Sequence, residues 1–357
     1  DEPPDEIRFT PGPRTICTYL HRDDSLKGKR LPKSPTTIWK ILDQYHRIPR
    51  PRPFERHPFE RPPAGDTWEI DFTDAISGAI EPDKRKKHGV EVFNVVDRGS
   101  SVWVDTESSS EFDAEHSLVA MTSILMDKGL PNTIVFDNDP RFVGSWTSEG
   151  FPSAFMRFLL CVGVNVQPCP PGRPQDKPFV ERLHRSLKSE CIRKARPGTL
   201  DDVQKVIKKY HRIYNNTRPH QAKVCKNLPP LVAVKEFPVM KKLPTEVDPD
   251  KWLTRYHNKY FTRQVTSNGS IRVGKQTYSV GKDLVGNTVT VIVDAHNRQF
   301  RIQTRLGERC KAIKGLVGGI MTFEHYLDRM LNEARSEARE LSRKRRLKKV
   351  RGAHDVK

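Results

Sequence analysis

The hexapeptide Thr67-Trp68-Glu69-Ile70-Asp71-Phe72 has the residue types of a β-strand and carries the Asp71 carboxylate between apolar neighbours. Outward from it, helix and strand patterns follow in the order strand 90–97, strand 102–107, helix 111–128, strand 133–137, helix 154–162, strand 164–166, helix 179–192 and helix 200–214. The turn-forming residues 98–101 indicate an antiparallel hairpin between the second and third strands. This alternation predicts an α/β domain with Asp71 on a central strand.

Three carboxylates stand out by position. Asp71 lies within the first strand, Asp137 ends the fourth strand at the carboxyl edge of the sheet, and Glu181 follows a loop rich in Gly and Pro. Acids placed in this way can converge on two divalent cations about 4 Å apart, which activate a water or a DNA 3′-hydroxyl and stabilise the leaving oxygen at phosphorus. Hard oxygen ligands suit Mg²⁺ or Mn²⁺. We expect these metals, and not nearby lysines, to relieve the repulsion between the acids.

Four motifs resemble those of one family, the integrase catalytic core of DDE transposases and retroviral-type integrases. They are Trp68-Glu69-Ile70-Asp71-Phe72-Thr73, Phe136-Asp137-Asn138-Asp139-Pro140-Arg141-Phe142, Pro174-Gln175-Asp176-Lys177-Pro178-Phe179-Val180-Glu181-Arg182 and Asn216-Thr217-Arg218-Pro219-His220. The last resembles a signature downstream of the core in bacterial insertion-sequence transposases. The resemblance covers residues 66–235 and matches Asp71, Asp137 and Glu181 to the catalytic, metal-binding acids. It implies an RNase H-like fold, two Mg²⁺ ions with Mn²⁺ as substitute, and DNA strand transfer.

Two features depart from the family pattern. Asp139 stands where many members have glycine, so it could compete with Asp137 as the second ligand. The 43 residues between Asp137 and Glu181 exceed the family's usual gap, and the excess fits an insertion around residues 145–152. Each acid also has a plainer interpretation: Asp137 as a turn residue, Asp71 as an edge-strand acid, and Glu181 as a charge favoured by the helix dipole.

The helix that carries Glu181 also places basic residues near it. Arg185 and Lys188 lie four and seven residues further on, so they share the helix face of Glu181. We expect these two side chains to meet a DNA phosphate bound at the metals, and ordinary solvated basic residues are the alternative. By helical spacing, His184 and Arg182 are predicted to point elsewhere.

Other polar residues have less definite roles. Asp74, Asp97 and Asp105 are acids of suitable type that fit no motif, and we predict that they are solvated. For Arg218 and His220, in the fourth motif, a packing or capping role is as well supported as a DNA contact.

The charge balance favours a polyanionic partner. The chain has 63 Lys and Arg residues against 44 Asp and Glu, a formal net charge of +19, which makes a nucleic acid the expected partner. The six cysteines lack zinc-type spacing and are predicted to be reduced and mostly buried. No apolar run approaches membrane-spanning length, and the opening residues lack the pattern of a signal peptide. We therefore expect a cytoplasmic, DNA-associated bacterial protein with no membrane partner.

Residues 1–48 are predicted to form a helical DNA-binding segment of the helix-turn-helix type. Ser34 as N-cap and Pro35 at the first helical position mark the start of its second helix. That helix presents short or basic side chains for reading the DNA major groove, namely Thr36, Thr37 and Lys40. A plain helical hairpin is the alternative.

The remaining parts are predicted in the order Pro/Arg linker at 49–65, RNase H-like integrase catalytic core at 66–237, small β-barrel at 251–315 and basic helical tail at 316–357. In the linker, Arg50 and Arg52 are expected to contact the DNA backbone without reading sequence. The barrel rests on five short strand patterns and loosely resembles the barrel that follows the core in Mu-type transposases. Low hydrophobic content and many prolines favour small cores joined by polar linkers.

These residues, with the resemblance, predict a DNA transposase that cleaves the ends of a mobile element and joins them to target DNA. We expect it to act as a homo-oligomer, a dimer or tetramer on DNA, and an accessory ATPase is a candidate partner. The alternatives are a domesticated, non-catalytic DNA-binding protein that retains the integrase fold and a plain RNase H-type nuclease. The intact acids argue against the first alternative, and the flanking DNA-binding segments argue against the second.

Overall fold

The computed structural model describes residues 13–45, 47, 61–76, 89–144, 150–170 and 176–354. Contacts divide the chain into two compact units, residues 1–60 and residues 61–357. The predicted DNA contacts Arg50 and Arg52 lie outside the described residues, as does most of the predicted insertion. Among the described helices, none combines the length and the apolar character needed to cross a membrane.

The first unit contains two α-helices, α1 (Pro13–Arg22) and α2 (Pro35–Gln44), with a short 3₁₀ turn at Asp24–Leu26 between them. The predicted start of α2 is confirmed, because the Ser34 side chain accepts a hydrogen bond from the Thr37 N–H. Thr36, Thr37 and Lys40 are exposed. Twelve residues separate the helices, whereas a helix-turn-helix connection has roughly three or four. Reading of DNA by α2 therefore stays a prediction.

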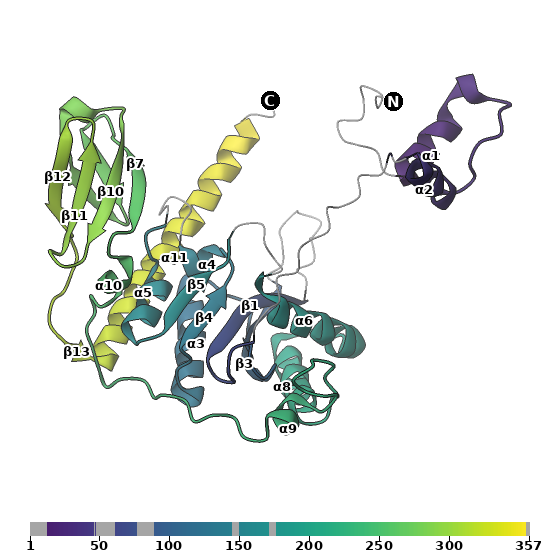
Figure 1. Ribbon diagram of the computed structural model, residues 1–357, viewed down its shortest axis with the longest axis horizontal. Helices are drawn as coiled ribbons and strands as arrows, with labels where there is room; N and C mark the ends of the chain where they lie inside the picture. Colours follow the sequence, from purple (N-terminus) through teal and green to yellow (C-terminus); the bar gives the residue numbers. More distant parts are fainter. Residues whose placement is uncertain are drawn as a thin grey trace. The chain divides into compact units, whose positions relative to one another are not determined.

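A five-stranded sheet forms the centre of the second unit (Figure 1). Its strands are β1 (Thr67–Ile76), β2 (Val90–Asp97), β3 (Trp103–Ser109), β4 (Thr133–Phe136) and β5 (Asn165–Pro168). The order is β3-β2-β1-β4-β5, antiparallel from β3 to β1 and parallel from β1 to β5. The predicted strands and the β2–β3 hairpin are confirmed, and Asp71 lies on the central strand.

Helices cover both faces of this sheet. They are α3 (Ala114–Lys128), α4 (Pro140–Val143), α5 (Ala154–Cys161), α6 (Pro178–Ser186), a π-helical turn (Leu187–Ile192), α7 (Arg193–Ala195), α8 (Leu200–Asn216) and α9 (Pro230–Val234). Side chains alternate along β2, so Phe93 and Val95 pack with α3 and α5 while Val92 and Val96 pack with α6 and α8. Because helices cover both faces of the sheet, most side chains of β2 are apolar.

Gly129 ends α3 and is required there. Its φ of +86° lies in the left-handed region, and a Cβ atom at this position would come within 2.5 Å of the Met240 Cβ. This close approach brings residues 238–250, which lie between the predicted catalytic core and the predicted barrel, against the core. Leu130 and Lys241 form an isolated β-bridge, and the two-residue strand β6 (Glu246–Val247) pairs with β13 (Met321–Thr322).

The C-terminal part contains more strands than the five predicted. After α10 (Trp252–Tyr256) come β7 (Tyr260–Gln264), β8 (Ser270–Val273), β9 (Gln276–Ser279), a 3₁₀ turn (Lys282–Leu284), β10 (Thr288–Asp294), β11 (Gln299–Thr304) and β12 (Gly307–Ala312). Hydrogen bonds join them as a four-stranded sheet, β12-β11-β10-β7, and a separate β8–β9 hairpin. Closure into a barrel is therefore not confirmed.

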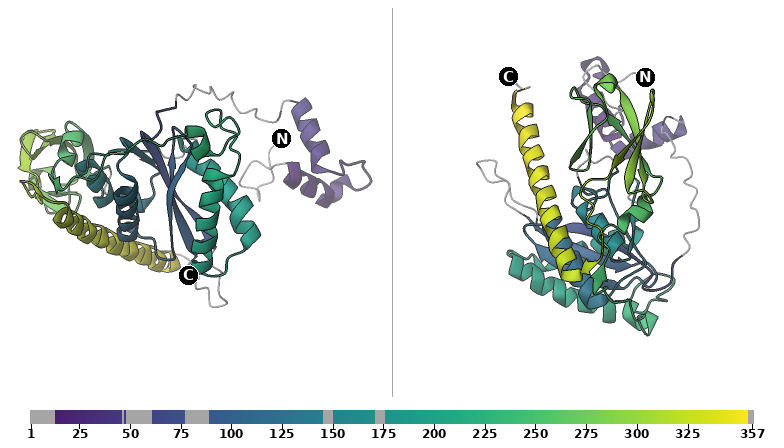
Figure 2. Two further views of the ribbon diagram at one scale, coloured as in Figure 1. Left: turned by 90° about the horizontal axis from the view of Figure 1, so that it is seen from below. Right: turned by 90° about the vertical axis from the view of Figure 1, so that its left-hand side faces the viewer.

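The helical tail, α11 (Phe323–His354), packs along α3 and α5 and is an integral part of the core (Figures 1 and 2). Tyr326, Met330 and Ala334 are buried within the apolar cluster that also contains the central sheet and the C-terminal strands. The expectation of small separate cores was wrong for residues 61–357. Through α11, one apolar cluster extends from one face of the central sheet to the C-terminal strands, while a second cluster packs the other face of the central sheet against α6 and α8.

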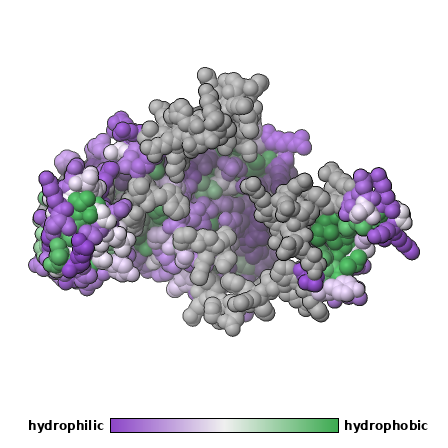
Figure 3. Space-filling model, turned by 90° about the horizontal axis from the view of Figure 1, so that it is seen from above, coloured by the Kyte–Doolittle hydropathy of each residue, from purple (hydrophilic) through white to green (hydrophobic). Residues whose placement is uncertain are grey.

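The N-terminal unit keeps part of its apolar surface in solvent. Ile41 is 39% exposed and Tyr45 is 68% exposed, and Figure 3 shows hydrophobic colouring on this unit at the right of the view. Only Ile38 of α2 is classed as buried among the residues with described burial. A unit this small has little apolar area to bury, so its stability depends on local features such as the Ser34 cap.

Candidate active site

The register of the parallel strands places the two aspartates side by side. Glu69 of β1 pairs with Val135 of β4. Two residues further along both strands, the same register brings Asp71 level with Asp137. Asp137 directly follows β4, where the chain leaves the sheet. The carboxyl ends of these strands therefore present both acids at one edge, as the sequence predicted.

Glu69 fixes the helix that carries the third acid. One Glu69 carboxylate oxygen accepts hydrogen bonds from the backbone N–H groups of Phe179 and Val180, at 2.9 and 2.8 Å, in the first turn of α6. The other accepts from Arg98 Nε at 2.7 Å, and Arg98 Nη2 donates to the Asp176 carbonyl. A buried acid two residues before Asp71 thus caps the helix that bears Glu181.

The Glu69–Arg98 pair is fully enclosed. Glu69 is 0% exposed, and burial raises the pKa of its carboxyl while Arg98 and the two helix N–H groups act in the opposite direction. A buried ion pair adds little net stability, but breaking one leaves an uncompensated charge. Neither residue was identified from the sequence, because Glu69 looks like an ordinary strand residue until α6 is placed above it.

His184 joins the acids, contrary to the prediction that it points elsewhere. Single ligand atoms of Asp71, Glu181 and His184 all lie within 4.8 Å of one another. His184 Nε2 lies 3.3 Å from the Asn94 side-chain nitrogen. Burial, with Lys188 and Lys177 nearby, lowers the pKa of His184 to about 3, so its ring is neutral at neutral pH. The signal was available, since residues three apart share a helix face.

Lys177 lies between the first two acids. Its Nζ is 2.8 Å from Asp71 Oδ2 and 3.5 Å from Asp137 Oδ2. Burial acts against its charge, yet the pKa of the Lys177 amine is raised because Asp71 and Asp137 outweigh burial. Burial raises the pKa of the Asp137 carboxyl, which Lys177 opposes and Asp71 reinforces. The expectation that no local lysine relieves the repulsion was therefore wrong.

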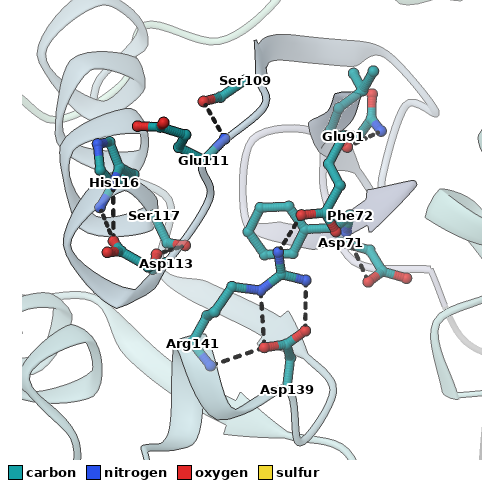
Figure 4. Close-up of polar contacts among 12 residues, drawn as sticks. Asp71, Phe72, Glu91, Ser109, Glu111, Asp113, His116, Ser117, Asp139 and Arg141 are labelled. Atoms are coloured by element: carbon teal, nitrogen blue, oxygen red, sulfur yellow. Dashed lines mark hydrogen bonds and ion pairs between the residues drawn. The ribbon is translucent and has the colours of Figure 1, made fainter. Parts of the chain in front are cut away.

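The two aspartates of the second motif, Asp137 and Asp139, make different contacts. The Asp139 carboxylate accepts hydrogen bonds from the Arg141 backbone N–H and from Arg141 Nε and Nη2, which caps α4 (Figure 4). Arg141 also donates to Glu91 at 2.8 Å, and its guanidinium stacks on the Phe72 ring. Asp137 instead directs Oδ2 at Lys177. Asp139 is engaged by Arg141, so the geometry favours Asp137 as the second acid.

One pocket of about 430 Å³ collects these side chains. Its lining includes Asp71, Asp137, Glu181, His184, Arg185 and Lys188. The predicted proximity of the two basic residues to Glu181 is thus confirmed. Their contact with DNA stays a prediction.

The acids that fit no motif are not all solvated. Asp97 is buried and accepts hydrogen bonds from the Gly65 N–H and from the N–H and hydroxyl of Ser100, so that prediction was wrong. Asp105 is partly buried beside Lys128, and Asp74 is exposed. Asp97 terminates β2 and shapes the turn after it, a structural role that its position before Arg98-Gly99-Ser100 suggests in hindsight.

The fourth motif stabilises the helical layer. Arg218 makes a bidentate ion pair with Glu190 of the π-helical turn, with both hydrogen bonds at 2.6 Å. The Tyr210 hydroxyl donates to the same carboxylate. His220 is buried, and its Nδ1 accepts a hydrogen bond from the Ala222 N–H. Of the two alternatives, the packing role is the one this geometry supports.

The donor set fits a divalent metal. Asp71 and Glu181 supply carboxylate oxygens beside the neutral His184 ring, and Asp137 adds a carboxylate on the other side of Lys177. Carboxylates suit Mg²⁺ and Mn²⁺, and a histidine nitrogen is a more usual ligand of transition metals than of Mg²⁺. Six acids line the pocket, against three basic lining residues and the adjacent Lys177, so a cation would compensate the excess negative charge.

Comparison with known proteins shows similarity to an integrase core family and to insertion-element proteins. Residues 162–230 match the family model described as an integrase core domain; this segment includes Glu181 but neither aspartate. The chain is 25% identical over 166 residues to the insertion element IS476 uncharacterized 39.2 kDa protein of Xanthomonas euvesicatoria, covering 46% of this chain and 43% of that protein. It is 24% identical over 157 residues to the insertion element IS407 uncharacterized 31.7 kDa protein of Burkholderia multivorans, covering 44% and 51%.

The chain thus spans about half the length of the curated relatives it matches. Among solved structures, it is similar to a chain of the simian T-cell lymphotropic virus intasome in complex with PP2A regulatory subunit B56 gamma, at 13% identity and a TM-score of 0.39, covering 85% of this chain and 97% of that one. It is also similar to the HTLV-2 integrase catalytic core domain in complex with magnesium, at 16% identity and a TM-score of 0.35, covering 49% and 99%. Scores of this size do not establish a shared fold by themselves.

The strand order of the central sheet and the family match are independent observations that support the same fold. Three antiparallel strands followed by two parallel ones, with helices on both faces, is the RNase H-like arrangement that the motifs implied. The matched segment continues this sheet through β5, α6 and α8. The match of residues 162–230 to the integrase core model, the similarity to insertion-element proteins and the motifs together support a DDE transposase or integrase.

Proposed function

We propose that this protein is a DNA transposase that cleaves the ends of a mobile element and transfers them to target DNA. The observation that carries the proposal is the convergence of Asp71, Asp137 and Glu181, from three separate elements, on one pocket. That pocket also presents Arg185 and Lys188. A site for a phosphodiester needs both features, acids that bind cations and basic residues that bind phosphates.

Each residue of the pocket has a distinct task in this proposal. Asp71, Asp137 and Glu181 hold two divalent ions, Mg²⁺ or Mn²⁺. When bound, these ions supply activation of the attacking oxygen and stabilisation of the leaving oxygen in an in-line displacement at phosphorus. Arg185 and Lys188 hold the DNA phosphates next to the acids. The Glu69–Arg98 pair keeps α6, and with it Glu181, at a constant position relative to β1.

The remaining parts of the chain bind DNA in this proposal. Thr36, Thr37 and Lys40 are exposed on α2, where short side chains can approach base edges. The net charge of +19 supports contacts with phosphates along the chain. Action as a dimer or tetramer on DNA, an accessory ATPase as partner and a place in the bacterial cytoplasm complete the proposal. Similarity to proteins named for insertion elements supports a mobile-element role.

A strand-transfer assay tests the function. Labelled duplexes carrying the terminal sequences of the encoding element are incubated with the protein, target DNA and Mg²⁺ or Mn²⁺. We expect Asp71→Asn, Asp137→Asn and Glu181→Gln each to reduce joining by at least about a hundredfold, because each removes one ligand, while DNA binding stays within about twofold.

Asp139→Asn is the matched control for the second acid. Its side chain is bound to Arg141, so we expect strand transfer to persist. Loss of joining in Asp139→Asn with normal joining in Asp137→Asn would reverse the assignment. A wild-type protein that binds the element ends tightly but joins nothing under any metal condition would favour the domesticated, non-catalytic alternative.

A further inference from the structure

Lys177 has no task in the proposed reaction, yet it is a buried charged side chain in contact with two of the proposed metal ligands. It is only 3% exposed. Its ammonium group contacts Asp71 at 2.8 Å and Asp137 at 3.5 Å. Lysine is almost never fully buried unless it is paired, and here its partners are two of the proposed metal ligands.

The ammonium group and a bridging metal compete for the same place. A Mg²⁺ ion held jointly by Asp71 and Asp137 needs an oxygen atom of each carboxylate at about 2.0–2.1 Å from the ion. Lys177 Nζ already lies between these two carboxylates, at hydrogen-bonding distance from Asp71. A cation so close to the metal would also repel it strongly in a partly buried pocket. Both cannot occupy the position between the acids.

The backbone around Lys177 is held in place on both sides. Arg98 donates to the Asp176 carbonyl on one side, and Glu69 accepts from the Phe179 N–H on the other. Withdrawal of the ammonium group is therefore a movement of the lysine side chain, whose four methylene groups allow several rotamers. The helix start and Glu181 need not move with it.

We propose that Lys177 is a resident cation that neutralises Asp71 and Asp137 before metal binds and is displaced from between them when a divalent ion enters. This inference rests on the proposed function, since it takes the two aspartates as metal ligands. Lys177 is a positioning residue in this view. It holds the acids together without metal and lowers the metal affinity of the site, so that loading with metal requires a rotamer change.

The test measures metal binding directly and does not depend on strand transfer. Mn²⁺ is titrated into the full-length chain, and free Mn²⁺ is followed by electron paramagnetic resonance. We expect Lys177→Gln to bind Mn²⁺ about tenfold more tightly than the wild type, because it removes a competing charge. We also expect Lys177→Gln to lower the metal-free Tm and to increase the rise in Tm on adding Mn²⁺.

Two matched variants control for charge and for folding. Lys188→Gln removes one positive charge from the same pocket. Among the described residues, Lys188 makes no ion pair with Asp71 or Asp137. The affinity of this variant for Mn²⁺ should therefore differ from that of the wild type by less than about threefold. Lys177→Arg keeps the charge and should keep the weaker wild-type affinity. If Lys177→Gln does not fold, the comparison of Lys177→Arg with Lys177→Met carries the test.

The outcomes separate this inference from the proposed function. If Asp71→Asn abolishes Mn²⁺ binding while Lys177→Gln binds no more tightly than the wild type, the metal site stands and the role of Lys177 is overturned. Weaker binding by Lys177→Gln would show that Lys177 supports the bound metal and would also overturn the inference. If wild type, Lys177→Gln and Lys177→Met all fail to bind Mn²⁺, the proposed metal site itself is contradicted, and the inference fails with it.

Discussion

His220 is a buried neutral histidine surrounded by positive charge. Burial, together with the charges of Arg182, Arg218 and Arg61, lowers its pKa to about 4. Its ring packs edge-on against Tyr214 at 5.8 Å. Because the folded-state pKa is below the unfolded value of about 6.5, this histidine contributes stability that is present above pH 6.5. That stability is lost as the pH falls from 6.5 towards 4.

We predict that His220→Gln reduces the acid sensitivity of the fold. Between pH 7 and pH 5, the wild type should lose about 2 kcal/mol more unfolding free energy than the variant, given about 1.4 kcal/mol per pKa unit. Urea denaturation at both pH values measures the difference. His116→Gln, at an exposed position, is the control and should keep the wild-type dependence. Parallel pH profiles for wild type and His220→Gln would contradict the assignment.

Some residues of the site could be predicted from local sequence patterns, and others could not. Asp71, Asp137 and Glu181 were predicted because each lies in a motif, at a strand or helix end, that the sequence displays. His184 was missed although its spacing from Glu181 was visible. Lys177 was missed because its role depends on two acids that lie 106 and 40 residues away in the chain, and no local pattern reports such a pairing.

At the scale of elements, one buried acid joins β1 to α6. Glu69 accepts hydrogen bonds from two N–H groups of the first turn of α6 and pairs with Arg98. We predict that Glu69→Gln lowers the unfolding free energy by about 3 kcal/mol, because it removes the charge of the carboxylate that pairs with the buried Arg98. It should also weaken hydrogen-exchange protection in residues 178–186 more than in α3.

Glu115→Gln is the matched control for Glu69→Gln. Glu115 pairs with Arg335 at the surface, and an exposed pair contributes about 0–1 kcal/mol. Chemical denaturation of both variants, with hydrogen exchange on the same samples, makes the comparison. Equal and small losses in both would mean that α6 is held by its apolar face alone.

Secondary structure was predicted correctly where it depends on short-range sequence signals. The strands β1 to β5 and the helices α3, α5 and α8 were predicted within a few residues, because alternation, caps such as Ser34 and stops such as Gly129 act over short distances. The π-helical turn at Leu187–Ile192 was predicted as plain helix. It forms where Glu190 meets Arg218 and Tyr210, partners from α8 and the segment after it.

At the scale of the whole molecule, the tail has two parts. Up to Ala338 it is bound to the core, with Arg157 paired to Glu333 and the Ala154 N–H donating to Glu337. Beyond residue 344, the sequence is strongly basic. The charges along α11 therefore divide into those of a packed segment up to Ala338 and those of a basic segment beyond residue 344.

We predict that deleting residues 345–357 leaves the Tm within about 2 °C of wild type but flattens the salt dependence of DNA binding. The deletion removes six Lys and Arg residues, and each lost phosphate contact reduces the slope of log K against log salt by about 0.9. Binding to a random duplex at several salt concentrations measures the slope. Arg335→Gln, whose partner is Glu115, should leave the slope unchanged. An unaltered slope in the deletion would favour a protein-docking role for this segment.

The sequence alone determined the local elements, the order of the acids and the excess of positive charge, because propensity, capping and charge are properties of neighbouring residues. Only the tertiary structure decided that Glu69 caps α6, that Lys177 separates Asp71 from Asp137, and that α11 belongs to the core. Each of these depends on strand register and helix packing between residues far apart in the chain. Such contacts are selected by the joint burial of many apolar groups, so the alternation within one strand or one helix does not specify them.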